Sequence, residues 1–315
     1  MAQWVSEAID EVTLDDEPQV FVQAGQSAEE NHVLASYFDG EFSQYLDGVI
    51  SHIYVTHASG DPLGIGGGAR DKLEYISDIW NSVSENLDIA VTEWNVGESG
   101  EATTLINGLM RSAPMLRLFA EMMRADVDIA TVWTANAPSP ASLGHEVNGA
   151  AVLTPTGYLF QLLATNLIGL TMQDLSTGDH LRDASGATVG YQYLFSDDSV
   201  NVLYLASGTS KNIAITADVS DQASNNSYVY ATILGAAPGE AGDQYHSAAA
   251  LRFVSDIQLE QLPDGTVSFE YNLDGYEVVQ LHFVEGRGIR INADQQNAIN
   301  DELLGTDFNL SLIHI

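Results

Sequence analysis

The first part of the chain, up to Asn166, alternates between short apolar runs and stretches with helical periodicity. Apolar residues recur every three or four positions between the runs, which predicts amphipathic helices there. Strands that alternate with helices favour a parallel sheet covered by helices, either a barrel of βα units or an open doubly wound sheet. The predicted strands are Val20–Ala24, Val49–Val55, Ile89–Val96 and Ile129–Thr134, and the predicted helices are Glu29–Phe38, Arg70–Leu87, Thr103–Arg124 and Gly157–Asn166.

The pattern changes after this last predicted helix. Apolar and polar residues now alternate one by one, and turn sequences such as Pro263-Asp264-Gly265 separate the segments. Short alternating segments with this punctuation predict an antiparallel β-sandwich. The segments are Val189–Phe195, Val200–Ala206, Asn212–Ala217, Tyr228–Leu234, Ala249–Leu259, Thr266–Leu273 and Glu277–Val284.

Composition narrows the function classes. The chain carries 44 acidic and 10 basic side chains, a formal net charge of −34. Such a surface repels phosphate backbones and anionic lipid, so neither nucleic acid nor a membrane is an expected partner. The absence of cysteine excludes disulfides and thiolate zinc sites. The histidines do not form a complete zinc motif, and we expect no catalytic metal.

Both ends of the chain suggest a piece of a longer protein. It opens inside a helical pattern, Trp4–Val12, and Asp301–Asn309 resembles the entry into RTX-type calcium-binding repeats. That resemblance implies calcium binding in the tail and a secreted, extracellular protein. The closing Leu310–Ile315 breaks the pattern, resembles read-through into non-native sequence, and is expected to lie outside the fold.

Several polar and aromatic side chains gather at one end of the predicted parallel strands. Side chains alternate along a strand, and barrel enzymes place their chemistry at the carboxyl ends of their strands. A carboxylate, an imidazole, a phenol and an indole are therefore expected to converge on one pocket. The predicted shared faces hold Val91, Glu93 and Asn95 on one strand, Ile50, His52 and Tyr54 on the preceding strand, and Thr131 and Trp133 on the last.

The run Val91–Val96 (VTEWNV) resembles the seventh-strand segment of the retaining glycosidase clan with (β/α)₈ barrels. It is most similar to the α-L-arabinofuranosidase and β-xylosidase-like members. The resemblance implies hydrolysis of a carbohydrate, without a cofactor, with Glu93 as nucleophile. It also implies that His52, Tyr54, Asn95 and Trp133 bind the substrate.

The same resemblance sets the expected fold class, α/β plus all-β. Residues 1–168 would form the C-terminal half of a TIM-type barrel, strands five to eight. Residues 169–288 would form the β-sandwich and residues 289–315 a tail. The acid/base Glu of the family follows the fourth strand, which would lie upstream of Met1, so we expect this chain alone to lack activity.

Other interpretations remain open at this level. Gly64–Ala69 (GIGGGA) fits the loose dinucleotide pattern, and an NAD-type domain would use Glu93 on the ribose. A non-catalytic carbohydrate-binding or adhesion segment could stack sugars on exposed tyrosines. Each site residue also has a plain structural interpretation: a surface Glu, core aromatics, a satisfied His, or an Asn that caps a loop. The tyrosines in question are Tyr228, Tyr230, Tyr245 and Tyr271.

Overall fold

The computed structural model describes most of the chain between residues 19 and 285, and one short segment near its end. The described residues are 19–38, 43–44, 46–55, 63, 68–96, 108–135, 141–198, 200–223, 227–242, 248–255, 257, 259–261, 263, 265–285 and 313–314. The predicted helix at Trp4–Val12 and the RTX-like segment Asp301–Asn309 lie outside them.

The four predicted N-terminal strands form one sheet in chain order, and all of them run parallel. Helices follow the first three strands, so the predicted alternation of strand and helix is confirmed. These elements are β1 (Phe21–Gln23), α2 (Ala28–Ala35), β2 (Gly48–Val55), α3 (Gly68–Asn81), β3 (Asp88–Val96), α4 (Ser112–Arg124) and β4 (Ile129–Val132).

Two helices differ from their predicted bounds. α3 ends at Asn81 rather than at Leu87, because the hydroxyl of Ser82 donates to the carbonyl of Ile79 and the chain tightens into a turn. Val83 and Leu87 still pack on the core from this turn, which is why their spacing looked helical. Before α4, the described chain forms a 3₁₀ turn over Gly108–Arg111 instead of a helical turn.

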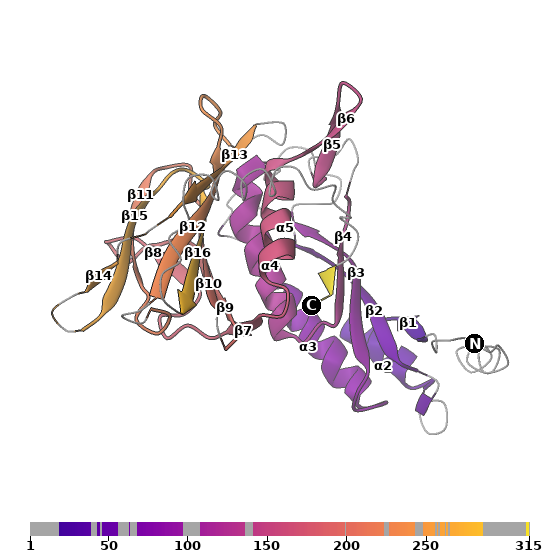
Figure 1. Cartoon of the computed structure of the whole chain (residues 1–315). Helices are drawn as coiled ribbons and strands as arrows, with labels where there is room; N and C mark the ends of the chain where they lie inside the picture. Colours follow the sequence, from indigo (N-terminus) through magenta and orange to yellow (C-terminus); the bar gives the residue numbers. More distant parts are fainter. Residues whose placement is uncertain are drawn as a thin grey trace.

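A β-hairpin between β4 and the next helix was not predicted. Its strands are β5 (Gly144–Val147) and β6 (Ala150–Leu153), and it projects beyond the end of β4 (Figure 1). Asn148 and Gly149 have φ angles of 53° and 83°, the conformation of a two-residue hairpin turn. An Asn-Gly pair is typical of such a turn and could have indicated the hairpin. The flanking strands are short and mostly exposed, so they lack the alternation of a half-buried strand.

The helix α5 (Pro155–Asn166) follows this hairpin and begins as its sequence dictates. The hydroxyl of Thr154 accepts a hydrogen bond from the Gly157 amide at 3.0 Å, and proline occupies the first turn. A Cβ on Gly157 would lie 1.9 Å from the carbonyl oxygen of Leu143. Glycine therefore permits α5 to pack against the chain that leads into the hairpin.

The C-terminal part consists of two antiparallel sheets. The larger has seven strands, ordered β13-β12-β16-β10-β9-β7 with β8 also paired to β9, and the smaller has the order β11-β15-β14. The seven predicted segments all contain strands, although β13 stops at Val254 where the prediction ran to Leu259, and β7, β8 and β14 were missed. The bounds are β7 (Thr171–Gln173), β8 (His180–Arg182), β9 (Thr188–Ser196), β10 (Val200–Ser207), β11 (Ile213–Asp218), β12 (Ser227–Ala236), β13 (Ala249–Val254), β14 (Glu260–Gln261), β15 (Val267–Leu273) and β16 (Val278–Glu285).

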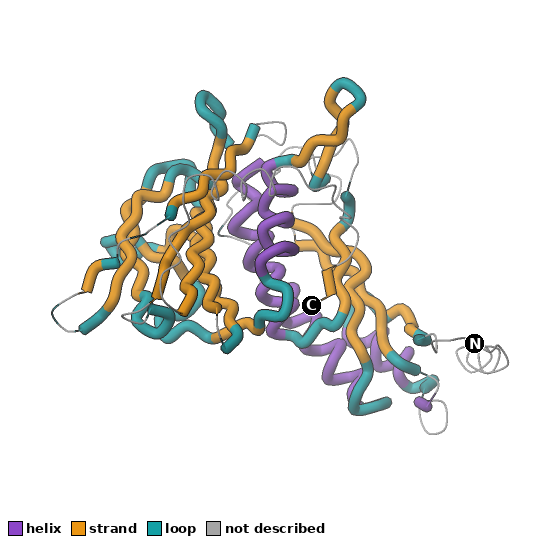
Figure 2. Tube along the Cα trace, viewed as in Figure 1, coloured by secondary structure: helices purple, strands orange, loops and turns teal. Residues whose placement is uncertain are grey.

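The seven-stranded sheet is buried on both faces. Leu194, Leu203 and Leu205 point to one face and share a core with Ile215 and Phe269 of the smaller sheet. The alternate residues of the same strands point to the other face and belong to the core that contains the helices and the parallel sheet. Figures 1 and 2 show α4 and α5 between the parallel sheet and the seven-stranded sheet. The residues on this helix-facing side include Tyr191, Tyr193, Phe195, Tyr204 and Ala206.

Polar contacts join α4 to the seven-stranded sheet and surround a hollow of about 240 Å³. Arg117 donates to the hydroxyl of Tyr191 at 2.9 Å, and Arg124 holds both carboxylate oxygens of Asp179. The Tyr191 hydroxyl in turn donates to the carbonyl of Leu63, at 2.9 Å, in the connection between β2 and α3. Three parts of the chain thus meet at one tyrosine.

The structure bears on the tyrosines that were considered for stacking on sugars. Tyr230 is not free to stack on a sugar, because its ring lies parallel to His282 at 4.4 Å; Tyr271 stacks on Phe269 at 5.6 Å. The side chain of Tyr228 and all of Tyr245 lie outside the described residues.

The closing residues were expected to lie outside the fold, yet β17 (Ile313–His314) pairs antiparallel with β4. An edge strand offers unpaired backbone groups, and these accept the segment. Among the described helices, none is long and apolar enough to span a membrane.

The environment of His282 predicts a pH dependence of stability. Burial lowers the pKa of His282 to about 4, so between pH 6.5 and 4 the unfolded chain binds a proton that the folded chain does not. The contribution of His282 to the free energy of unfolding is therefore fully present above pH 6.5. It is lost as the pH falls to 4, and the loss amounts to about 3 kcal/mol. Urea unfolding at pH 7 and pH 4 should show that His282→Gln loses about 3 kcal/mol less than the unsubstituted chain. Equal losses would contradict the prediction, and the paired comparison is needed because burial raises the pKa of Glu277, with the opposite effect on the pH dependence.

The contacts of α4 predict unequal costs for two arginine substitutions. Arg124→Ala leaves Asp179 without its bidentate partner in a partly buried position and should lower the free energy of unfolding by about 2 kcal/mol. Arg70→Ala removes only an exposed pair with Glu74 and should change it by less than about 0.5 kcal/mol. Chemical denaturation of both variants measures these changes. A loss of unfolding free energy for Arg124→Ala as small as that for Arg70→Ala would show that the contacts of Arg124 do not stabilise the fold.

Candidate functional site

Glu93 lies near the carboxyl end of β3 and contacts the neighbouring strand. The hydroxyl of Tyr54 on β2 donates to Oε2 of Glu93 at 2.7 Å, and Nδ1 of His52 lies 3.5 Å from the same oxygen. The side chains of Glu93 and His52 are 34% and 36% exposed. Three of the predicted site residues are therefore together, and the carboxylate is open to a ligand.

A β-bulge in β3 aims Glu93 at this face. Ser51 pairs with Val91 and the next residue of β2, His52, pairs with Glu93, so Thr92 is an extra residue in β3. The alternation changes phase at the bulge, and Val91 faces the helices with Trp94 rather than sharing a face with Glu93 as predicted. The carbonyl of Thr92 accepts a hydrogen bond from the Thr131 hydroxyl on β4. Bulges are frequent beside active sites because they redirect a side chain in this way.

Trp133 supplies the apolar surface of the site. It follows β4, it is 47% exposed, and its ring meets that of Tyr54 in a T-shaped arrangement with centroids 6.5 Å apart. The other described tryptophans, Trp80 and Trp94, are 1% exposed and belong to the core. The peptide bond between Trp133 and Thr134 is cis. An exposed indole beside an accessible carboxylate can cover the C–H face of a sugar ring.

Asn95 is not exposed in the site with these four residues. It is fully buried, and its amide donates to the carbonyls of Trp133 and Ala141. Its oxygen accepts from Arg111 and from the amide of Val96. The donors and acceptors of the side chain are used within the protein, which favours the structural interpretation over contact with a substrate.

Two cations near the site were not anticipated from the sequence. Arg111 is completely buried behind Asn95. Lys72 on α3 donates to the carbonyl of His52 at 2.9 Å and to Gln26 at 3.1 Å, and burial lowers its pKa. Both occur in stretches whose pattern indicates only an amphipathic helix, so no local signal sets them apart.

The dinucleotide interpretation is not favoured by the described geometry. A Rossmann glycine run follows its strand directly and opens the helix. Here β2 ends at Val55, and α3 begins at Gly68, so a long connection separates the strand from the helix. Gly64–Gly67 lie outside the described residues. Glu93 is engaged by Tyr54 rather than placed alone beside a glycine turn.

Within the described residues, no group of three or more His, Asp or Glu side chains is arranged to hold an ion. The predicted calcium site belongs to the tail, outside the described residues.

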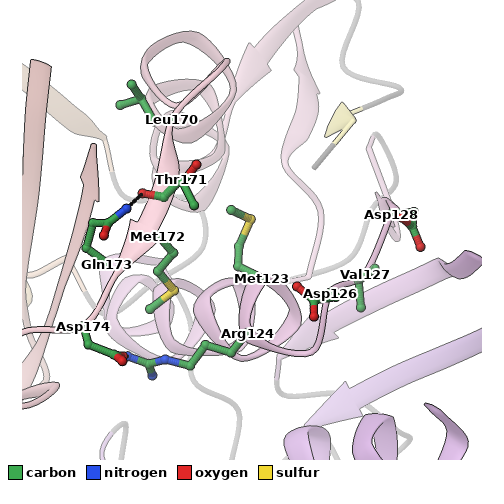
Figure 3. Close-up of a pocket in the computed structure, with 10 residues that line it drawn as sticks. All are labelled: Met123, Arg124, Asp126, Val127, Asp128, Leu170, Thr171, Met172, Gln173 and Asp174. Carbon is green, nitrogen blue, oxygen red and sulfur yellow. Dashed lines mark hydrogen bonds and ion pairs between the residues drawn. The ribbon is translucent and has the colours of Figure 1, made fainter. Parts of the chain in front are cut away.

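A hollow of about 560 Å³ lies at the opposite end of β4 (Figure 3). The end of α4 and the residues before β4 form one side, and Leu170–Asp174 form the other. Methionines Met123 and Met172 face it and aspartates stand at its rim. In parallel α/β proteins chemistry is usually found at the carboxyl ends of the strands, and this hollow lies at the other end of β4, away from Glu93.

Comparison with known proteins identifies the fold. No protein-family model and no curated protein sequence matches the chain. Among solved structures, the GH51 α-L-arabinofuranosidase from Thermotoga petrophila RKU-1 aligns with a TM-score of 0.57 and 13% identity, over 90% of this chain and 62% of that one. The α-L-arabinofuranosidase from Thermotoga maritima, in a complex with arabinose, gives 0.56 and 14%, over 90% and 61%. The GH39 enzyme from Xanthomonas axonopodis pv. citri gives 0.51 and 12%, over 89% and 62%.

These structures are glycoside hydrolases, and at such identities the likeness is one of fold alone. The chain spans about three fifths of the length of the structures it matches, with 62% and 61% for the two arabinofuranosidases.

The exposure of Trp133 predicts a contrast between two tryptophan substitutions. Trp94→Ala removes a side chain that packs against Phe119 and Phe160, and should lower the free energy of unfolding by about 4 kcal/mol. Trp133→Ala should lower it by less than about 1 kcal/mol, because the ring is half exposed and leaves no cavity. Denaturant titration of both variants measures the difference; a large loss at Trp133 would make it a core residue rather than a binding surface.

Proposed function

We propose that the chain belongs to a glycoside hydrolase that cleaves O-glycosidic bonds by a retaining double displacement, with Glu93 as the nucleophile. The observation that carries this proposal is the accessible Glu93 carboxylate, held by Tyr54, next to an exposed Trp133 at the carboxyl ends of parallel strands. The fold shared with glycoside hydrolases supports it. The chemistry of the site, rather than the fold, decides the reaction.

We propose different tasks for the two oxygens of Glu93 on the basis of their contacts. Tyr54 and His52 both approach Oε2, which fixes the plane of the carboxylate. Oε1 is then the oxygen that attacks the anomeric carbon, and a covalent glycosyl-enzyme forms as the leaving oxygen departs. Charge on the carboxylate falls during attack, and the Tyr54 hydroxyl remains bonded to Oε2 throughout. Its contribution is orientation, because a misplaced carboxylate loses the near-attack geometry.

Trp133 would place the sugar over this carboxylate. Its exposed ring offers an apolar face to the C–H side of a pyranose or furanose, and burial of that face contributes binding energy with a defined orientation. The Tyr54 ring, which stands perpendicular to the indole, restricts the positions that a bound sugar can take. A pentose or hexose unit at the non-reducing side of the bond is the substrate class that we propose.

The general acid is proposed to come from outside the described residues. A retaining enzyme needs a second carboxyl group about 5–5.5 Å from the nucleophile. The carboxylate contacts found for Glu93 in the described chain come from a phenol and an imidazole. We propose that β1–β4 correspond to strands five to eight of a (β/α)₈ barrel and that the acid lies on the other half. Secretion and calcium binding by the tail remain proposals that rest on Asp301–Asn309.

A mechanism-based label tests the nucleophile without the acid. An activated 2-fluoro glycoside with a 2,4-dinitrophenolate leaving group needs little acid assistance, so Glu93 should attack it and remain labelled. Incubation with the arabinofuranosyl and xylosyl forms, followed by mass spectrometry of the intact chain and peptide mapping, should place one glycosyl group on Glu93. Tyr54→Phe should lower the labelling rate about tenfold, because the carboxylate loses its orienting bond.

Two controls give the labelling its meaning. Glu93→Gln should abolish it, whereas Glu74→Gln, which changes an exposed glutamate on α3, should leave it unchanged. Ordinary aryl glycosides with poor leaving groups should not be turned over by this chain alone. Labelling at a residue other than Glu93, or none with either sugar, would reject the proposed nucleophile.

A further inference from the structure

We infer that Asn95 and Arg111 are positioning residues that hold Trp133 over the site. They form a buried polar joint between the end of β3, the end of β4 and the chain that follows β4. The placement of Trp133 follows from the geometry alone, whereas its consequence for sugar binding rests on the proposed function.

Asn95 is the centre of this joint. Its Nδ2 donates to the carbonyl of Trp133 and, at 2.9 Å, to that of Ala141; its Oδ1 accepts from Arg111 and from the Val96 amide. Two donors and two acceptors are thus all engaged, in a side chain with no exposed surface. Such a fully satisfied buried network allows one arrangement only, because any other would leave a buried polar group unpaired.

Arg111 anchors the joint to the rest of the molecule. Its guanidinium donates to Asn95 and to the carbonyl of Val96, so it clamps the last two residues of β3. The 3₁₀ turn that carries it is fixed from two sides. The amide of Leu109 donates to the carbonyl of Gly242 at 2.7 Å, and the Thr156 hydroxyl donates to that of Gly108 at 3.3 Å.

The ring of Trp133 depends on its backbone for its orientation. Nearly half of the residue is exposed, and its ring meets that of Tyr54 in a perpendicular arrangement. The backbone is held on both sides, since the Trp133 amide donates to the Trp94 carbonyl at 3.1 Å and its carbonyl accepts from Asn95. Loss of the Asn95 bond should therefore move the indole while Glu93 and Tyr54, which use other contacts, stay in place.

Asn95→Asp is the sharpest substitution for this joint. It keeps the size of the side chain and the contact to Arg111, but it turns the two donors into an acceptor that faces two carbonyl oxygens. Arg111→Lys keeps the charge, but its side chain ends one bond short of the Nη2 nitrogen that donates to both Asn95 and Val96.

The chain offers a matched control in Asn31. This asparagine is also fully buried, and its amide also makes four bonds, to the backbone of Gly25 and Ser27 and to the indole of Trp80. Asn31→Asp creates the same chemical conflict between β1 and α2, in a network that has no member in common with the Asn95 joint.

The experiment measures the position of Trp133 and the binding step separately in the full chain. The acrylamide quenching of tryptophan fluorescence is measured for each variant and for the same variant with Trp133→Phe. The difference between the two gives the quenching of the Trp133 indole. Labelling by the activated 2-fluoro glycoside is then resolved into a dissociation constant and a first-order rate constant. Asn95→Asp should change the Trp133 quenching and raise the dissociation constant about tenfold, with the rate constant altered less than about twofold. Arg111→Lys should show the same pattern more weakly, and Asn31→Asp neither effect.

The outcomes separate this inference from the proposed function. Unchanged Trp133 quenching in Asn95→Asp, or an equal change in Asn31→Asp, overturns the positioning role. A lower rate constant with an unchanged dissociation constant also overturns it, because that result would place the joint at the nucleophile. If the unsubstituted chain takes no label, the proposed function fails, and the quenching comparison still decides the positioning role.

Discussion

Burial of the seven-stranded sheet on both faces is the constraint on which the rest of this structure depends. One face forms a core with the smaller sheet, and the other packs on α4 and α5. α4 is accordingly buried along most of its length, because it lies between that sheet and the parallel sheet. A helix that is buried along most of its length needs partners on more than one side. The parallel strands, the helices and the antiparallel part therefore form one continuous packing arrangement, and the site at the end of β3 inherits its rigidity.

The site uses this rigid base in two ways. Glu93, Tyr54 and His52 are held by strand pairing and by one bulge, so their relative positions follow from the sheet. Trp133 lies just beyond the sheet, where strand pairing ends. There the buried hydrogen bonds of Asn95 hold the backbone in place of strand pairing. Strand pairing suits a reacting group because it sets distances closely. An amide with four partners suits the end of a strand, because it can satisfy a loop that has no regular hydrogen bonds of its own.

The sequence predicted the elements better than the details of the site. Buried strands such as Val49–Val55 are rich in β-branched apolar residues, which made them easy to predict. The antiparallel strands were predicted from their alternation, which the sequence keeps because a shift of one residue would turn the apolar side chains to the wrong face. The convergence of Glu93, His52, Tyr54 and Trp133 followed from the carboxyl ends of neighbouring strands. The bulge at Thr92 could not be predicted, since nothing in Val91-Thr92-Glu93 distinguishes a regular strand from a bulged one. Arg111 was equally hidden, because its role depends on a turn and on Asn95, which are brought together only by the fold.

The hydroxyl of Tyr191 joins β9 of the antiparallel part to α4 and to the connection that follows β2. That connection follows β2, the strand that carries His52 and Tyr54. Leu63, in the same connection, packs closely on Gly208, and a Cβ on Gly208 would lie 2.4 Å from the leucine side chain. The antiparallel sheets are therefore not an interchangeable module. A chimera that grafted a different C-terminal part onto these βα units would need a tyrosine hydroxyl and a glycine at the corresponding positions, or it would lose the contacts that hold Leu63.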